Sequence, residues 1–379
     1  MKKLISTAFA AFSLFCLSTA ALAAPPIKIG ALFAVTGPAS FLGEPERNTA
    51  QMVVDEINKA GGVKGRKLEL IVYDTGGDAT KAVQLANKLI KNDNVVAIIG
   101  PSTTGDTMAV APVADKAGIP LVSCAAGSKI TDPVRKNVFK TAQNDALAVA
   151  RIYEQLKKEK KSKVAILSVS DGFGSSGREQ LKAQAAAYGI QIVSDDTFGP
   201  KDTDMTAQLT KIRASGADCL QIWAIPPAAS TVTKNAFDLG LKLPVFQSHG
   251  IGNQTFIDLA GPSANGVIFP VGKLLVASSL PDSDPQKTVL VDYTAAYKTA
   301  YGKLPTTFGG HAWDAFWIAV KAMEKAGPDS AKIRDEIEKI RNFVGVTGVF
   351  DFSATDHNGL DNRAVTMVKI DGGTWKPAE

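Results

Sequence analysis

VVAIIGPSTTGDTMAVAPVADKAGIPLV, residues 95–122, contains the pattern that decides the fold of this chain. The apolar run at 95–99 predicts a buried strand, residues 106–116 predict a helix, and 119–122 predict a second strand. Apolar strands that alternate with helices form parallel sheets covered by helices on both faces. The stretch therefore predicts α/β structure.

The same alternation continues on both sides of this stretch. Further strands are predicted at 27–33, 68–73, 164–169, 190–193, 220–223, 245–246, 347–352 and 365–370, with helices between them and a helical region at 292–340. One series of strands precedes residue 145 and another follows it, which predicts two doubly wound domains. The transit at 140–145 is short and has no low-complexity linker, so we expect the domains to lie close together and to be hinged.

The N-terminus has the pattern of a secretory signal. Lys2 and Lys3 precede an apolar run that ends at Leu17, and Ala21-Leu22-Ala23 follows as an A-x-A cleavage site. The run is too short to span a bilayer. We therefore expect residues 1–23 to be removed during export, which excludes most classes of cytosolic enzyme.

The composition describes an ordinary globular protein, with 45% apolar and 21% charged residues. Loss of Lys2 and Lys3 lowers the formal net charge from +5 to +3, which does not favour a nucleic-acid partner. Cys124 and Cys219 remain after cleavage. They allow one disulfide in an oxidising compartment, but their apolar surroundings favour buried free thiols.

One enzyme-like motif is present. Gly172-Phe173-Gly174-Ser175-Ser176-Gly177 matches G-x-G-x-x-G, follows the strand at 164–169, and is followed about 20 residues later by Asp195 and Asp196. This is the layout of a dinucleotide site, so an exported NAD-dependent oxidoreductase is one alternative. A strand-to-helix turn in any doubly wound domain favours glycine for the same geometry.

Other catalytic patterns are absent from the sequence. There is no G-x-S-x-G nucleophile turn and no phosphate-binding G-x-x-x-x-G-K-[ST] loop. His249, His311 and His357 are isolated and lack metal-ligand spacing. We therefore expect neither a metal site nor a cofactor, and we expect the protein not to be an enzyme.

Two turns rich in hydroxyl groups follow neighbouring strands. Ser102-Thr103-Thr104-Gly105 precedes the helix at 106–116, and residues 123–128, SCAAGS, follow the strand at 119–122. Hydroxyl and amide groups at a helix N-terminus favour anions, although helix capping alone explains such residues as well. In an open α/β sheet, ligands bind at the carboxyl ends of the strands. Together the turns predict a pocket for a small carboxylate.

These residues resemble a known family. The chain is similar to the periplasmic branched-chain amino-acid-binding proteins of ABC importers, which are type I solute-binding proteins. The resemblance covers essentially the whole mature chain, and its most specific part is the I-N-x-x-G-G-x-x-G stretch at 57–65. Supporting matches are Ile27-Lys28-Ile29-Gly30, Thr36-Gly37-Pro38, Phe139-Lys140-Thr141, Asp171-Gly172-Phe173-Gly174 and Gly250-Ile251-Gly252-Asn253.

The resemblance implies two Rossmann-like α/β lobes joined by a three-strand hinge, with the ligand in the cleft between them. The crossings would fall near 140–145, 269–273 and 347–352. Lobe 1 would then contain residues 24–144 and 273–348, and lobe 2 residues 145–272 and 349–379. A ligand-sensing module with the same fold is a further alternative.

The resemblance also implies which residues surround the ligand. Thr104 and its neighbours would hold the carboxylate, and aromatic and apolar side chains would wall the rest of the pocket. The expected ligand-binding residues are Phe41, Leu42, Ser102, Thr103, Thr104, Ala125, Gly127, Ser128, Phe173, Ile225 and His249.

Three of these positions depart from the amino-acid binders. Ile225 replaces a tyrosine, Gly127 replaces a threonine for which Ser128 can substitute, and His249 replaces the glutamate that pairs with the ligand's ammonium group. A buried ammonium without a carboxylate partner carries a penalty of several kcal/mol. Asp145 or Asp171 would restore ammonium binding if either pointed into the cleft.

We therefore expect a carboxylate ligand without an α-amino group, such as an aromatic or branched 2-oxo acid or an aryl acid. A branched-chain amino acid is the alternative if His249 faces solvent at the rim. The lobes would close on the ligand by hinge motion and deliver it to an inner-membrane ABC permease. We expect the protein to act as a monomer and without a nucleic-acid partner.

Overall fold

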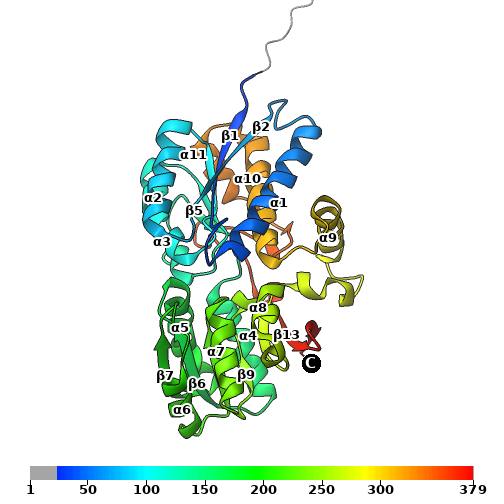
Figure 1. Cartoon of the computed structure of the whole chain (residues 1–379). Coiled ribbons are helices and arrows are strands. Elements are labelled where there is room, and N and C mark those ends of the chain that lie inside the picture. The colour runs from blue at the N-terminus through cyan, green and yellow to red at the C-terminus, as the bar shows by residue number, and fades with distance from the viewer. Residues whose placement is uncertain (1–23, 379) are drawn as a thin grey trace, which may run out of the picture.

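The computed structural model describes residues 24–378, which form two α/β lobes stacked one on the other (Figure 1). The predicted signal segment, residues 1–23, lies outside the described residues. No helix in the described range is both long enough and apolar enough to cross a membrane.

The first lobe is built on a five-stranded parallel sheet with the order β2-β1-β3-β4-β5. Strands β1, β3, β4 and β5 are almost entirely buried, as expected for strands covered on both faces, whereas the edge strand β2 is mostly half-buried. The strands are β1 (Ile27–Phe33), β2 (Leu68–Asp74), β3 (Ala97–Ile99), β4 (Leu121–Ser123) and β5 (Val138–Lys140).

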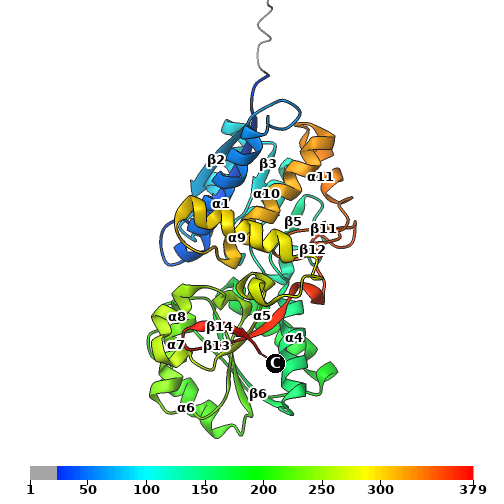
Figure 2. The same ribbon diagram turned by 90° about the vertical axis from the view of Figure 1, so that its right-hand side faces the viewer.

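Helices cover both faces of this sheet. One face packs against α1, α10 and α11, and the other packs against α2 and α3. Helix α9 lies to one side, beside α1 (Figure 2). The helices are α1 (Ser40–Lys59), α2 (Ala79–Lys88), α3 (Thr104–Ala117), α9 (Lys287–Tyr301), α10 (Thr307–Ala326) and α11 (Ser330–Ile337).

The second lobe contains a seven-stranded sheet with the order β14-β13-β10-β9-β8-β6-β7. Strands β6 to β10 are parallel, and β13 and β14 extend the sheet in antiparallel fashion. The strands are β6 (Lys163–Val169), β7 (Gln191–Phe198), β8 (Cys219–Trp223), β9 (Val245–Phe246), β10 (Ile268–Val271), β13 (Thr366–Asp371) and β14 (Thr374–Pro377).

Helices again cover both faces of the second sheet. One face packs against α6, α7 and α8, and the other packs against α4 and α5. The helices are α4 (Asp145–Lys158), α5 (Gly172–Gln184), α6 (Thr206–Ala214), α7 (Ala228–Asp238) and α8 (Gln254–Ala260). The parallel strands of the two lobes follow the same order, because β7-β6-β8-β9-β10 repeats β2-β1-β3-β4-β5. The prediction of two doubly wound α/β lobes is confirmed.

The chain passes between the lobes after β5 and after β10, close to two of the predicted crossings. The third differs from the prediction. Residues 347–352 contain β12 (Val349–Phe350), which pairs with β11 (Phe343–Val344) in a hairpin. Phe352 and Leu360 also pack into the core of the first lobe. Aromatic burial therefore keeps the chain in the first lobe until it enters the second sheet at β13.

Candidate functional site

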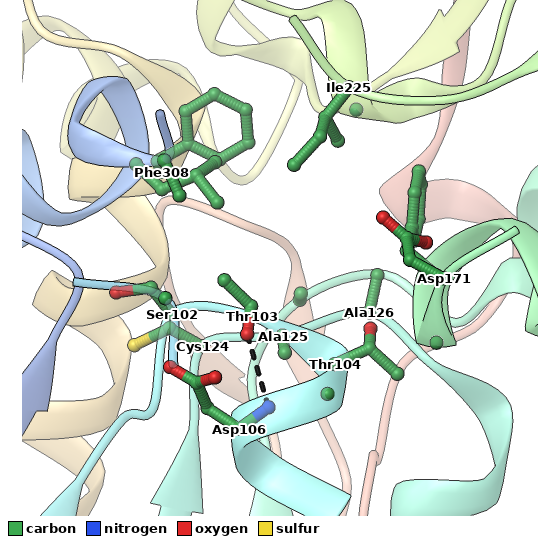
Figure 3. A pocket seen from close by; sticks show the side chains of 18 of the residues that line it. Ser102, Thr103, Thr104, Asp106, Cys124, Ala125, Ala126, Asp171, Ile225 and Phe308 are labelled. Carbon is green, nitrogen blue, oxygen red and sulfur yellow. Dashed lines mark hydrogen bonds between the residues drawn. The ribbon is translucent and has the colours of Figure 1, made fainter. Parts of the chain in front are cut away.

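A cavity of about 350 Å³ lies between the two lobes, at the carboxyl ends of the strands of the first sheet (Figure 3). Most of its walls are apolar, and no lysine or arginine of residues 24–378 lines it. The first lobe contributes Pro38, Ala39, Leu42, Gly76, Gly77, Ala79, Ser102, Thr103, Thr104, Gly105, Asp106, Cys124, Ala125, Ala126, Ala142, Gln143, Thr307, Phe308 and His311. The second contributes Val169, Asp171, Gly172, Phe173, Pro200, Ile225, Pro227, Ala228, His249, Gly250 and Val271.

The N-terminus of α3 forms one wall of the cavity. Thr103 caps the helix, and its Oγ1 accepts a hydrogen bond from the Asp106 amide at 3.1 Å (Figure 3). The amides of Thr104 and Gly105 donate to no protein acceptor within the described residues. Free first-turn amides and the positive end of the helix dipole favour an anion at this place.

The turn after β4 lies beside this helix end. The Gly127 amide donates to Thr104 Oγ1 at 3.3 Å, which joins the two turns. The buried Lys140 Nζ donates to the carbonyl oxygens of Ala126 and Gly127, at 2.5 and 3.3 Å. Lys140 therefore fixes the peptide groups of the turn from behind, although it does not itself reach the cavity.

Position 127 accommodates only glycine, because Thr104 fills the space beside it. A Cβ atom at position 127 would lie 2.4 Å from Thr104 Cγ2, far closer than a van der Waals contact allows. The threonine of the amino-acid binders would not fit at position 127 with Thr104 in place. Ser128 does not substitute for it, since its hydroxyl bonds to Asn144 and it does not line the cavity.

Apolar side chains form the wall opposite α3. Phe308 from α10 and Leu42 from α1 come from the first lobe, and Ile225 comes from the second. Phe41 does not line the cavity. It packs behind Phe308 with its ring edge toward the other ring, at a centroid distance of 5.6 Å.

His249 lies inside the cavity wall rather than at a solvent-exposed rim. It is 7% exposed, and its ring lies against the rings of Phe173 and Trp223, with centroids 5.4 and 5.7 Å away. Burial, together with smaller effects of the Lys140 charge and of His311, lowers the pKa of His249 to about 3. The imidazole is therefore neutral at physiological pH, and both ring nitrogens lack a hydrogen-bond partner in the described part of the chain.

The two carboxylates that could restore ammonium binding differ in their position relative to the cavity. Asp145 is fully buried behind His249, with Oδ1 3.5 Å from His249 Nε2, and it does not line the cavity. Burial raises its pKa to about 7, against the opposing effect of Lys140. Asp171 does line the cavity, but it caps α5 and accepts a hydrogen bond from the Gly174 amide at 2.8 Å.

Packing within the second lobe explains two of the three glycines of the G-x-G-x-x-G motif, Gly174 and Gly177, whereas Gly172 lines the cavity beside Gly105 of the first lobe. A Cβ atom at Gly174 would lie 1.8 Å from the Val169 carbonyl oxygen, and one at Gly177 would lie 2.0 Å from the Trp223 ring. Both positions therefore need glycine for the close approach of α5 to its own sheet, whether or not any ligand binds.

The acidic residues of that motif are also engaged elsewhere. Asp195 pairs with Arg178 at 2.5 Å, and Asp196 pairs with Lys211 at 2.7 Å. Neither carboxylate is free to hold a ribose. The structure gives no support to the oxidoreductase alternative.

Other sequence expectations concern cysteines and histidines. Cys124 and Cys219 are both buried and free, and they belong to different lobes. The part of the chain that the structure describes contains no cluster of His, Cys, Asp and Glu able to hold a metal ion. His357 stacks on Phe139 at 4.0 Å, away from the cavity.

The lobes touch each other around the cavity. The Ser128 amide donates to Ser176 Oγ at 3.0 Å, and Thr307 Oγ1 donates to the Gly252 carbonyl at 3.3 Å. Each bond joins a residue of the first lobe to one of the second. The cavity is thus enclosed by contacts on two sides.

The sequence missed the contribution of α10. Thr307, Phe308 and His311 line the cavity although they follow the second lobe in the sequence. Thr306 caps α10 by accepting a hydrogen bond from the Gly309 amide at 3.4 Å. This hydroxyl-bearing helix start is the same kind of signal as Thr103 at α3, and it could have pointed to the site.

The comparison with protein families gives one clear match. A model of the family described as periplasmic binding protein matches residues 26–374, nearly all of the described chain. Among relatives, the Leu/Ile/Val-binding protein homolog 3 of Brucella melitensis is 30% identical over 377 residues, covering 98% of both chains. A leucine-, isoleucine-, valine-, threonine-, and alanine-binding protein of Pseudomonas aeruginosa is 26% identical, over 92% of this chain and 91% of its own.

Solved structures are similar over the same length. An extracellular ligand-binding receptor from Rhodopseudomonas palustris HaA2 superposes with a TM-score of 0.87 at 29% identity, covering 93% of this chain and 99% of its own. The branched-chain amino acid transporter substrate binding protein LivJ of Streptococcus pneumoniae, solved with isoleucine, gives a TM-score of 0.83 at 26% identity, with the same coverage.

Proposed function

The chain belongs to the periplasmic binding protein family, and from this premise we propose that it is the substrate-binding component of an ABC importer. In this role it captures a small apolar carboxylate between its lobes in the periplasm. The proposal includes removal of residues 1–23 during export, and action as a monomer that docks on an inner-membrane permease.

The carboxylate is proposed to bind at the N-terminus of α3. The free amides of Thr104 and Gly105 face the cavity from the first turn of that helix. The Thr104 hydroxyl accepts from the Gly127 amide, so its own hydrogen remains available to a ligand. Because no cationic side chain of the described residues lines the cavity, peptide groups and hydroxyls would carry the recognition of charge.

The ligand is proposed to lack an α-ammonium group. The observation that carries this proposal is the buried, neutral His249, which offers no negative charge where a bound amino acid needs one. Asp145 is shielded behind it. An aromatic or branched 2-oxo acid or an aryl acid would suit a carboxylate site that faces Leu42, Phe308 and Ile225.

A branched-chain amino acid is the second candidate. It is favoured by the names of the relatives and by Asp171, a carboxylate that lines the cavity. Against it, one Asp171 oxygen is occupied in capping α5, and burial raises the Asp171 pKa, which disfavours its negative charge.

Hinge closure completes the proposed mechanism. The ligand would first bind the polar turns of the first lobe, and Phe173, Ile225 and His249 of the second lobe would then close over it. Closure is stabilised only to the extent that the ligand contacts the closed form better than the open form. No bond in the ligand is broken by these steps.

Equilibrium titration of the mature protein tests the proposal. We expect phenylpyruvate, 4-methyl-2-oxopentanoate or benzoate to bind with micromolar affinity, about −8 kcal/mol, and to raise the melting temperature. Leucine serves as the matched comparison, because it shares the carboxylate and the apolar side chain. If leucine bound far more tightly than every acid in the panel, a branched-chain amino acid would replace the oxo or aryl acid as the proposed ligand. Failure of all carboxylates to bind would contradict the proposed function itself.

A further inference from the structure

Glu46 is a buried acid behind the cavity wall, on the inner face of α1. It is fully buried and does not line the cavity. One of its carboxyl oxygens, Oε2, forms a short hydrogen bond with the Ser102 hydroxyl, and the other, Oε1, has no hydrogen-bond partner among residues 24–378. Ser102 does line the cavity, so Glu46 acts on the site only through that hydroxyl.

The surroundings of Glu46 favour its neutral form. The titratable groups that interact electrostatically with it are Asp106 at the start of α3 and Cys124 after β4, and Cys124 is also influenced by Asp314 on α10. All of these groups are acidic, and no lysine or arginine of residues 24–378 forms an ion pair with the Glu46 carboxyl. Burial therefore raises the pKa of Glu46 well above its ordinary value.

The direction of the hydrogen bond between Ser102 and Glu46 depends on whether the Glu46 carboxyl group is protonated. A hydroxyl group can donate one hydrogen bond and accept two. Ser102 Oγ already accepts from the Ala34 amide at 3.0 Å. If Glu46 is ionised, the Ser102 hydrogen must point to Glu46. If Glu46 is protonated, Ser102 accepts from it and keeps its own hydrogen free.

We propose that Glu46 is a positioning residue for the ligand: as a neutral acid it donates to Ser102 Oγ, and it thereby directs the Ser102 hydroxyl hydrogen into the cavity. There the hydrogen binds an acceptor oxygen of the captured acid. This inference rests on the proposed capture of a carboxylate in the cavity. It assigns a role to a residue that does not touch the ligand.

A double-mutant cycle between Glu46 and Ser102 tests the coupling, with titration of phenylpyruvate and of leucine. We expect Ser102→Ala to weaken binding about tenfold, since it removes one hydrogen bond to a charged ligand. Glu46→Met should weaken binding by a similar factor, because the Ser102 hydrogen is then no longer directed at the ligand. The double variant should bind no more weakly than Ser102→Ala alone. Glu46→Gln should restore affinity to within about twofold of the unmodified protein, because its amide group still donates to Ser102 Oγ.

A matched control comes from the same helix. Glu44 is exposed and pairs with Lys303, so Glu44→Met should leave the affinity unchanged. Melting curves of all variants show whether each is folded. If Glu46→Met does not fold, two other variants replace it. Glu46→Gln and Glu46→Leu are each combined with Ser102→Ala, and their affinities are compared.

Several results would overturn the inference. Glu46→Met that binds as tightly as the unmodified protein would do so, as would Glu46→Gln that binds as weakly as Glu46→Met. If Glu46→Met weakened binding equally in the presence of Ser102 and in the Ser102→Ala variant, the role of Glu46 would be merely structural. Absence of binding by the unmodified protein would instead refute the proposed function, so the two failures are distinguishable.

Discussion

The two sides of the cavity recognise a ligand by different means. The first lobe presents the amides of Thr104 and Gly105 and hydroxyl groups at the start of α3, which favour a negative charge. The second lobe presents Phe173, Ile225 and the neutral His249, and its one carboxylate at the cavity, Asp171, is engaged in capping α5. Under the proposed function, the backbone of one lobe would recognise the charge common to all ligands, whereas side chains of the other lobe would select among them.

The largest effect is expected from a charge on the neutral side. His249→Glu would place a second buried carboxylate beside Asp145, and an acid ligand would leave it unpaired. We expect phenylpyruvate binding to weaken by about 3 kcal/mol, or about 100-fold. Leucine should gain relative to the oxo acid because its ammonium group pairs with the new carboxylate. Titration of both ligands measures the change.

His249→Gln is the control for that variant, because it keeps a neutral polar group at the position. It should change the ratio of the two affinities by less than threefold. If His249→Glu left the preference between phenylpyruvate and leucine unchanged, His249 would not determine which ligand binds. The apolar wall would then be the source of that preference.

A somewhat smaller effect is expected where the two turns of the first lobe meet. In Gly127→Thr, the new Cβ would lie 2.4 Å from Thr104 Cγ2, so the first turn of α3 must shift. Overpacking of this kind costs about 1–3 kcal/mol, and we expect every ligand to bind about 30-fold more weakly. The paired change Thr104→Ser with Gly127→Thr removes the methyl group and should restore most of the affinity. Equal losses in the single and paired variants would place the cause outside this contact.

Thr104→Ala tests the charge-binding side directly. It removes a hydroxyl that we expect to contact the carboxylate, and it deprives the Gly127 amide of its acceptor. We expect a loss of about tenfold for acids and amino acids alike, since both carry the carboxylate. Ser128→Ala is the control, because that side chain does not line the cavity. A loss confined to one class of ligand would contradict the assignment of charge recognition to this lobe.

The sequence predicted the fold well because the deciding pattern is local. Apolar strands that alternate with capped helices can be recognised from neighbouring residues alone. One example is Asp78, whose side chain caps α2. The third crossing was misplaced because it depends on where Phe350 and Phe352 pack. That is a tertiary contact with α10 and α11, which no local pattern displays.

The candidate site was predicted in part, for the same reason. The turns at Ser102–Gly105 follow strand ends, so topology alone brings them to the cavity. Phe308 joins them from a segment about 200 residues later, and the shielding of Asp145 by His249 depends on side-chain packing. The resemblance supplied Phe173, Ile225 and His249, but it could not show that His249 is buried and neutral.

The smallest effect should come from pH, and its near absence is informative. An exposed imidazole titrates near its ordinary pKa, so it would gain positive charge as the pH falls from 6.5 to 4.5 and strengthen the binding of an anion. Burial lowers the pKa of His249 to about 3, so it stays neutral throughout this range. We expect the affinity for phenylpyruvate to change less than threefold in titrations across it, in the unmodified protein and in His249→Gln. Binding that strengthens tenfold toward acid pH only when His249 is present would mean that this side of the cavity can acquire charge, and that both lobes contribute to recognition of the carboxylate.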